Sequence, residues 1–269
     1  DSDWNYKDIP HVHNVHSQID QSIPISIGDK YVSLINLQRI PFIRITLPLT
    51  VTIYEYSRFN IIYLSSFGPY TIVINTKILE LDNNKCETTT EYTILTKGLF
   101  SLFFPFIKKM LLKNYSKLMS EDVPMRDQRG ILRENDHFFF IPDESYSFDF
   151  TTEVFRNNVR LGRGKNRRLT FSKKNIFKNK PDTVGENNGI LSFFITYEEN
   201  INIWPKTCPH EGADLNKECL KKNKLSCPWH GRSFNPIISL DNHGNVISKD
   251  EKIYNISIEN DDIEIIFKN

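Results

Sequence analysis

The sequence predicts an α+β protein in which an antiparallel sheet and a long helix come first and a small all-β domain follows. Three observations support this class. Between residues 31 and 96, β-branched and aromatic segments alternate with Gly, Pro and Asn breaks. After Gly98, apolar residues recur at helical spacing, and beyond residue 190 short β-rich segments return. With 269 residues and 39% hydrophobic content, the chain is long and apolar enough for two folded domains.

The N-terminal half contains the clearest strand and helix signals. The strongest strand segments, all rich in β-branched or aromatic residues, are 43–47, 50–56 and 70–78. The helix is expected at 99–119, with Phe103, Phe104 and Phe106 in the core. A strand meander closed by one long helix resembles a helix-grip (START-like) domain, in which a curved sheet wraps the helix and leaves a pocket between them. We assign residues 1–135 to this domain.

Residues 136–185 form a different kind of segment. Between 156 and 180 the chain contains ten Lys or Arg residues and no Asp or Glu. We interpret the segment as a solvated basic connector; a docking face for an acidic electron-transfer partner or a neighbouring subunit is the alternative. Residues 186–269 are assigned to the small β-domain. Its strands are expected at 191–197, 253–258 and 262–267.

Composition excludes several classes of protein. The formal net charge of +1 argues against a nucleic-acid-binding protein. No stretch of about 18 apolar residues is present, so we expect no membrane span. The most apolar segment, 99–107, is too short and runs into Lys108 and Lys109. Cys86 and Cys219 lie far apart and give no disulfide framework, so a reducing, cytoplasmic compartment is expected.

Four residues near the C-terminus have the spacing of a metal-cluster motif. Cys208 and His210 are followed, after sixteen residues, by Cys227 and His230, so that each of two loops supplies one thiolate and one imidazole. A Rieske [2Fe–2S] cluster needs this donor set, with two cysteines on one iron and two histidines on the other. A structural zinc site is the alternative. Zinc knuckles favour Cys-x-x-Cys pairs, however, and neither half contains one.

The segments CPHEGADL and CPWHGRSFNP resemble the Rieske domains of oxygenases and their ferredoxins. High-potential Rieske proteins of respiratory chains carry two further cysteines, joined by a disulfide, at the positions of Ala213 and Trp229 in this chain. The resemblance therefore implies a lower-potential cluster of the oxygenase or ferredoxin type, held by the four residues of the motif.

A second motif lies near the N-terminus, where three of the seven histidines fall within six positions. The spacing Asp8-x-x-His11-x-x-x-x-His16 is similar to a motif of Rieske non-haem iron oxygenases. The resemblance implies that His11 and His16 bind a mononuclear Fe(II), which also needs a carboxylate and leaves positions open for O2 and substrate. It implies that Asp8 links this iron to the Rieske histidine of a neighbouring subunit. His13 is expected to point away, although a His13–His16 pair stays open.

The third iron ligand is expected at the end of the long helix. Glu121 and Asp122 resemble the Glu-Asp segment of the same family, and we assign Asp122 as the ligand. Glu121 and Asp127 are the neighbours that could take its place. The alternative without a metal is that the two acids simply close the helix before Pro124.

The resemblance as a whole implies a Rieske non-haem iron oxygenase, similar to the α-subunits of aromatic-ring-hydroxylating oxygenases. It would use O2 and electrons from an external ferredoxin or flavin reductase to hydroxylate, demethylate or desaturate a small organic substrate. Members of this family place the Rieske domain first, so the domain order here is reversed. A homo-oligomer such as a trimer is expected, since closure of a ring of subunits does not depend on chain order.

Two rival functions remain. One is a non-catalytic helix-grip ligand-binding protein fused to a Rieske electron-transfer module, and the other is an oxygenase-associated ferredoxin. A ferredoxin needs only the β-domain, so the long N-terminal part speaks against it. The iron content separates the oxygenase from the ligand-binding protein, because only the oxygenase needs an iron outside the cluster.

Overall fold

The computed structural model describes residues 5–6, 8–40, 45–57, 59–82, 85–134, 167–185 and 191–267. These residues form two compact units that divide within the long helix α3 (Phe104–Glu134): the first reaches to Arg126 and the second begins at Asp127. The first contains an antiparallel sheet with the long helix, and the second contains small β-sheets. The predicted α+β class is therefore confirmed.

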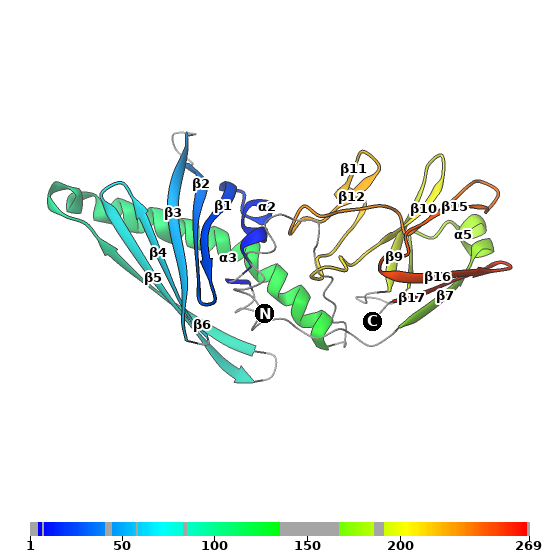
Figure 1. The fold of residues 1–269 in the computed structure, drawn as a ribbon, viewed down its shortest axis with the longest axis horizontal. Coiled ribbons are helices and arrows are strands. Elements are labelled where there is room, and N and C mark those ends of the chain that lie inside the picture. Colours follow the sequence, from blue (N-terminus) through cyan, green and yellow to red (C-terminus); the bar gives the residue numbers. More distant parts are fainter. Residues whose placement is uncertain are drawn as a thin grey trace. The chain divides into compact units, whose positions relative to one another are not determined.

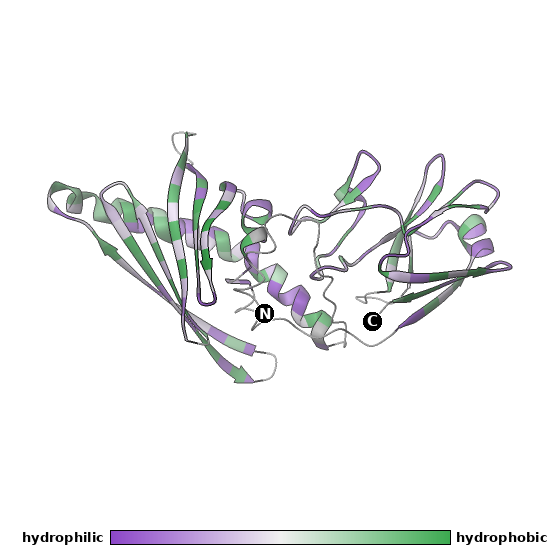
Figure 2. Cartoon of the chain, in the orientation of Figure 1, coloured by the Kyte–Doolittle hydropathy of each residue, from purple (hydrophilic) through white to green (hydrophobic). Residues whose placement is uncertain are grey.

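The first unit is built on a six-stranded antiparallel sheet in which each strand pairs with the next along the chain. Its strands are β1 (Ile19–Gly28), β2 (Tyr31–Ile40), β3 (Ile45–Ser57), β4 (Asn60–Phe67), β5 (Tyr70–Asp82) and β6 (Lys85–Leu95). Helix α3 lies along one face of this sheet (Figure 1). Apolar and polar residues alternate along much of the strands (Figure 2), as expected when only one face of a sheet is covered.

The N-terminal segment is fixed against this sheet. The short helices η1 (Ile9–His11) and α2 (Val12–Val15) lead directly into β1. Ile9 is buried in one cluster with Val32 and Leu34 of β2, which lie two residues apart and therefore on the same face, and with Ile53 and Ile61. This apolar contact holds the segment that carries the histidine motif.

Helix α3 is longer than the sequence predicted. It follows η2 (Gly98–Phe103) and continues through Pro124 to Glu134. The interpretation that Glu121 and Asp122 close the helix before Pro124 is therefore wrong. A proline inside a helix removes one backbone hydrogen bond. Met125 and Leu132, which follow Pro124 in the helix, are both buried, and the free energy gained by burying them offsets the loss of that bond.

The end of η2 and the first turn of α3 expose their aromatic side chains. Phe103, Phe104 and Phe106 are all exposed, so the expectation that they belong to the core is wrong. Ile107, which follows Phe106 directly, is the buried residue of this turn instead. Among the described residues, no helix is long and apolar enough to cross a membrane.

The second unit consists of three small sheets. The largest has the strand order β15 (Val246–Lys249), β14 (Ile238–Leu240), β10 (Ile201–Pro205), β9 (Ser192–Tyr197), β8 (Thr183–Gly185). A second sheet has the order β16 (Tyr254–Glu259), β17 (Asp262–Phe267), β7 (Arg168–Ser172), and a third the order β11 (Leu220–Lys221), β12 (Lys224–Ser226), β13 (Ser233–Phe234). The first two share one apolar core, which includes Phe193, Ile203 and Tyr254.

Part of the predicted connector belongs to this second unit. Strand β7 pairs with β17, and Ile176 of the helix α5 (Lys173–Asn179) is completely buried in the core. The basic residues of this stretch lie between apolar residues that are buried (Ile176) or partly buried (Leu169, Phe171, Phe177), which the number of charges alone does not reveal. The rest of the predicted connector, 136–166, lies outside the described residues, and the boundaries at 135 and 185 stay predictions.

Candidate metal centres

The first cluster loop follows strand β10 and is closed by its own backbone. The amide of Gly212 donates to the carbonyl of Cys208 at 2.9 Å, and the amide of Cys208 donates to the carbonyl of Ala213 at 2.8 Å. Gly212 has a φ of 92°, a conformation that side chains other than glycine rarely adopt. The chain therefore turns sharply around Cys208 and His210, which places both side chains in one loop.

The second loop repeats this construction between β12 and β13. The amide of Gly231 donates to the carbonyl of Cys227 at 2.8 Å, and the amide of Cys227 donates to the carbonyl of Arg232 at 2.7 Å. Gly231 has a φ of 68°. Two turns of the same design thus present Cys227 and His230 in the same way as the first pair.

The two loops bring the four predicted ligands together. All four side chains are buried. The Nδ1 atoms of His210 and His230 lie 3.2 Å apart. Two imidazoles held about 2.0–2.1 Å from one tetrahedral metal would have nitrogens about 3.3–3.4 Å apart, so this pair fits a single iron. The two histidines on one iron, with two cysteines left for the other, are the donors that a Rieske cluster requires.

The two buried thiols interact with each other. Burial raises the pKa of both, but the thiol of Cys227 and nearby backbone amides stabilise the Cys208 thiolate, so the pKa of Cys208 is lowered and that of Cys227 is raised. One thiolate at this position is thus favoured before any metal binds. Cluster assembly has to remove the second proton.

The loops carry no disulfide. None of the four cysteines, all of them described, forms a disulfide, and Ala213 is completely buried at the position where a high-potential Rieske protein would have a cysteine. We therefore expect the cluster to titrate at the low end of the Rieske range of roughly −150 to +300 mV. A redox titration followed by EPR checks this, and a midpoint well above zero would contradict it.

Arg129 on the last turns of α3 holds the first cluster loop within the second unit. Its guanidinium donates to the carboxylate of Glu211 and, at 3.2 Å, to the carbonyl of Glu211. Both side chains are buried. Glu211 follows His210 directly, so this ion pair fixes the backbone next to a cluster ligand.

Replacing Arg129 by methionine is expected to lower the free energy of unfolding of the second unit by about 3 kcal/mol, because a buried carboxylate loses its counter-charge. Denaturant unfolding of the full chain measures this. The double variant Arg129→Met, Glu211→Gln removes both charges and should recover part of the loss. If the single and double variants are equally unstable, the ion pair is not the cause.

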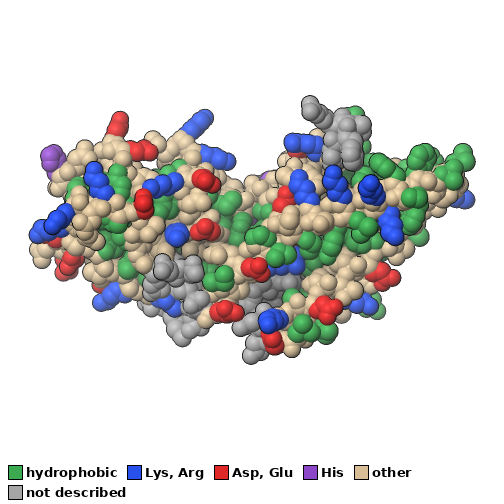
Figure 3. Space-filling view, turned by 180° about the vertical axis from the view of Figure 1, so that it is seen from behind, with side chains coloured by type: hydrophobic (Ala, Val, Ile, Leu, Met, Phe, Trp, Pro, Cys, Tyr) green, Lys and Arg blue, Asp and Glu red, His purple; other side chains and the backbone are tan. Residues whose placement is uncertain are grey.

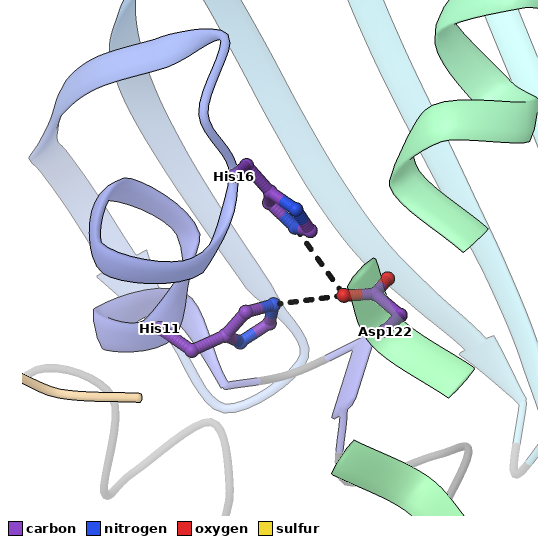
Figure 4. A group of neighbouring side chains, drawn as sticks. All are labelled: His11, His16 and Asp122. Carbon is purple, nitrogen blue, oxygen red and sulfur yellow. Dashed lines mark ion pairs between the residues drawn. The ribbon is translucent and has the colours of Figure 1, made fainter. Parts of the chain in front are cut away.

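A second group of potential ligands lies in the first unit. His11 and His16 come from the N-terminal segment and Asp122 from α3, and their side chains converge (Figure 4). One ligand atom from each lies within 4.8 Å of the others, and all three residues are buried. Oδ1 of Asp122 is 3.6 Å from Nε2 of His11 and 3.4 Å from Nε2 of His16. The three residues chosen from the sequence therefore meet at one point.

Each histidine is oriented by a carboxylate behind it. Nδ1 of His11 is 3.4 Å from Oδ2 of the buried Asp8, and Nδ1 of His16 is hydrogen-bonded to Oε2 of Glu121 at 3.1 Å. The other Glu121 oxygen accepts from the hydroxyl of Ser17 at 2.9 Å. A carboxylate on the far nitrogen is the usual way in which metal-binding histidines are held, and it leaves Nε2 for the metal.

The structure separates the alternative ligands. Both carboxylate oxygens of Glu121 are already hydrogen-bonded, one to Nδ1 of His16 and the other to the hydroxyl of Ser17. Asp127 is exposed. His13 is exposed, and its ring contacts the side chain of Asn14. Asp122 is thus the carboxylate that faces both imidazoles. Sequence reasoning missed the orienting part played by Glu121, although it had singled out that residue for its place beside Asp122.

The group fits a metal ion better than it fits an apolar core. Within the described residues, Nε2 of His11 and Oδ1 of Asp122 are buried and make no hydrogen bond. Burying such atoms without a hydrogen bond is costly. A cation between the two imidazoles and the carboxylate would satisfy these atoms. Two histidines and one carboxylate are the donor set of mononuclear non-haem iron sites.

Charges around the group set its protonation. Burial lowers the pKa of His11, but the adjacent Asp122 and Asp8 outweigh this and raise the pKa to about 9. Burial and the neighbouring His11 lower the pKa of His16. Burial raises the pKa of Asp122, but His11, His16 and Arg126 lower it overall. Near neutral pH the metal-free group therefore holds one proton, on His11.

We expect Fe(II) to displace this proton, so that about one proton is released per metal bound at pH 7. Because His11 loses its proton anyway as the pH rises through about 9, the release should fall toward zero above that pH while the affinity for the metal rises. Anaerobic calorimetric titration of cluster-loaded protein in buffers of different ionisation enthalpy measures the release. No release at pH 7, or release that grows with pH, would show the assignment to be wrong.

A cavity of about 260 Å³ lies between the sheet and α3, and the metal group forms part of its wall. Leu111, Tyr115, Leu118 and Met119 line it from the helix, and inward-facing residues of β1 to β6 line it from the sheet. The ionisable lining residues other than tyrosine are His11, His16 and Asp122, all of them in the metal group. The cavity therefore suits a neutral and largely apolar molecule, with the metal group as its polar end.

Comparison with known proteins supports the cluster assignment. Residues 169–248 match the family described as Rieske [2Fe-2S] domain. No curated protein and no solved structure matches the chain. The chain thus contains a Rieske [2Fe–2S] domain following an N-terminal antiparallel sheet with a long helix, and this domain implies a [2Fe–2S] cluster and electron transfer.

Proposed function

We propose that this protein is a Rieske-type non-haem iron oxygenase. It would take electrons from an external ferredoxin or flavin reductase and use O2 to hydroxylate, demethylate or desaturate a small organic substrate. The observation that carries this proposal is the buried His11, His16 and Asp122 group in the wall of an apolar cavity, in the same chain as a Rieske domain. A ligand-binding protein would have no need of a buried two-histidine, one-carboxylate group.

When bound, the cluster would supply electrons one at a time, and Fe(II) at the second site would supply O2 activation. The chain's own residues prepare that site. Glu121 and Asp8 orient the two imidazoles. Arg126, whose Nη2 is 3.7 Å from Oδ2 of Asp122, adds to the effect of the two histidines in lowering the pKa of this carboxyl. The apolar cavity wall keeps water from competing with the substrate.

For Asp8 we propose the role that the resemblance implies, a polar link between His11 and the cluster histidine of a neighbouring subunit. Its position supports this, because the carboxylate is completely buried and lies on the far side of the His11 ring from Asp122. A homo-oligomer, such as a trimer, follows from this proposal.

Nitric oxide tests for the open iron site without knowledge of the substrate. Protein loaded anaerobically with Fe(II) should give the EPR signal of a high-spin iron–nitrosyl, and the His16→Ala variant, loaded in the same way, should not. O2 uptake by the reduced protein with a panel of neutral apolar compounds then tests turnover. A ligand-binding protein fused to a Rieske module would give neither the nitrosyl signal nor uptake above that of His16→Ala.

A further inference from the structure

The first unit carries a concentrated apolar patch where α3 begins. We define this docking patch as four residues that are 79%, 73%, 58% and 57% exposed, namely Leu99, Leu102, Phe103 and Phe106. Phe100 and Phe104 beside them are also exposed. Single exposed apolar residues are common, but a contiguous set of this kind marks an interaction surface. Figure 3 shows hydrophobic side chains gathered at this end of the first unit, with Lys or Arg side chains beside them.

The patch is held in place. The hydroxyl of the buried Tyr70, at the start of β5, donates to the carbonyl of Phe100 at 2.9 Å, and the two rings are in edge-to-face contact with centroids 6.4 Å apart. On the opposite side of the first turn of α3, Ile107 is buried. These contacts fix η2 and the first turns of α3 to the sheet. The exposed side chains are thus presented outward by a rigid support.

The surroundings of the patch carry one sign of charge. From residue 92 to residue 120 the chain contains five lysines and no Asp or Glu. All five lysines are exposed, namely Lys97, Lys108, Lys109, Lys113 and Lys117. Their long stems can lie along an apolar layer while the ammonium groups reach polar headgroups. Segments that lie in the membrane interface have this composition: leucine and phenylalanine beside lysine, on a helix that is too polar to span a bilayer.

We propose that the docking patch binds the first unit to the surface of an anionic lipid bilayer. Charge decides between this partner and a second copy of the chain. Two copies joined through the patch would bring their lysines together, which is unfavourable, whereas anionic headgroups neutralise them. The apolar side chains would enter the boundary between headgroups and acyl chains.

One face of α3 connects this patch to the metal group. Ile107, Leu111, Tyr115, Leu118 and Asp122 follow one another at helical spacing, and all but Ile107 line the cavity. The path from Ile107 to Asp122 is about 22 Å at 1.5 Å per residue. A lipophilic substrate taken from the bilayer would reach the metal along this face. This last step rests on the proposed function, whereas membrane binding itself needs no metal.

Sedimentation with lipid vesicles tests the docking patch directly. The full chain, with and without metals, is mixed with phosphatidylcholine vesicles that contain or lack phosphatidylserine. We expect binding that requires phosphatidylserine and weakens at high salt. Leu102→Ser, Phe103→Ser should abolish it, and Lys108→Glu, Lys109→Glu should weaken it by at least about fivefold for each lysine. Leu79→Ser, Leu81→Ser, at 60% and 59% exposed positions of β5, is the matched control and should bind normally.

Two results would overturn the proposal. One is a failure of the patch to account for binding: either the chain binds vesicles of neither composition, or the patch variants and the control variant lose binding to the same extent. The other is concentration-dependent self-association in gel filtration that the patch variants abolish, which would assign the patch to a second copy. Failure of the nitrosyl test alone would leave membrane binding standing, because the vesicle assay does not depend on the iron.

Discussion

Replacing His210 or His230 by alanine is expected to remove the [2Fe–2S] cluster completely. Both imidazoles are buried and their Nδ1 atoms are 3.2 Å apart, so each would occupy one of two places on the same iron. Among the described residues of the second unit, the remaining histidine is His243, which is exposed in a turn and cannot replace either of them. The variants should be colourless and should lack the reduced-state EPR signal of the wild-type protein.

The matched control is His243→Ala, which removes the same side chain from an exposed turn of the same unit and should keep the cluster. Circular dichroism separates loss of the cluster from loss of the fold, because the apolar core around Phe193 and Ile203 does not include the cluster ligands. A coloured His210→Ala protein with an unchanged EPR signal would refute this ligand assignment.

Replacing His11 or His16 by alanine is expected to remove the second metal and leave the cluster intact. Each variant deletes one of three donors that converge in a buried site, and the affinity of the remaining pair should be too low to retain Fe(II) during gel filtration. Iron analysis should fall from three to two per chain, two irons being those of the cluster. The EPR signal of the cluster should not change.

His13→Ala is the control for these variants, because His13 lies in the same segment but is exposed and contacts Asn14. Asp8→Ala gives the sharper contrast. Asp8 contacts His11 from the side away from Asp122, so excess Fe(II) should still fill the site, while coupled turnover should fall by about 10–100-fold or more. If Asp8→Ala keeps full activity, or if His16→Ala keeps three irons, the catalytic assignment fails.

The Rieske domain could be recognised from the sequence because the motif of its proposed cluster ligands is local. Two short turns determine the positions of Cys208, His210, Cys227 and His230, and the glycines that make the turns are part of the motif. His11 and His16 could be picked out from the sequence for the same reason, since they belong to one short motif. Asp122 lies more than a hundred residues away in sequence, and only the family resemblance pointed to it.

The sequence could not show that Asp122 faces both imidazoles while Glu121 orients His16 from behind. Adjacent residues on a helix point about 100° apart, so one of the two had to face the histidines directly. Which one does so depends on how α3 is rotated against the sheet. That rotation is set by contacts such as the edge-to-face pair of Tyr92 and Tyr115, which join residues far apart in the chain.

The expectation that Phe103, Phe104 and Phe106 are buried is wrong, because it rests on helical spacing as evidence of a core. Phe103 and Phe106 have the spacing of a buried helix face, but periodicity identifies a face without showing what covers it. The buried residue of this turn is Ile107 instead. Likewise, the excess of basic residues between 156 and 180 suggested a connector, and only the burial of Ile176 shows that part of it belongs to a core.

We expect the chain to hold a Rieske cluster and a separate mononuclear iron. Iron, zinc and acid-labile sulfide are therefore to be counted in the full chain after anaerobic reconstitution with Fe(II) and sulfide and removal of loosely bound metal. The predicted result is three irons and two sulfides per chain, with no zinc. Two irons and two sulfides would leave only the electron-transfer domain, and zinc without sulfide would contradict both centres.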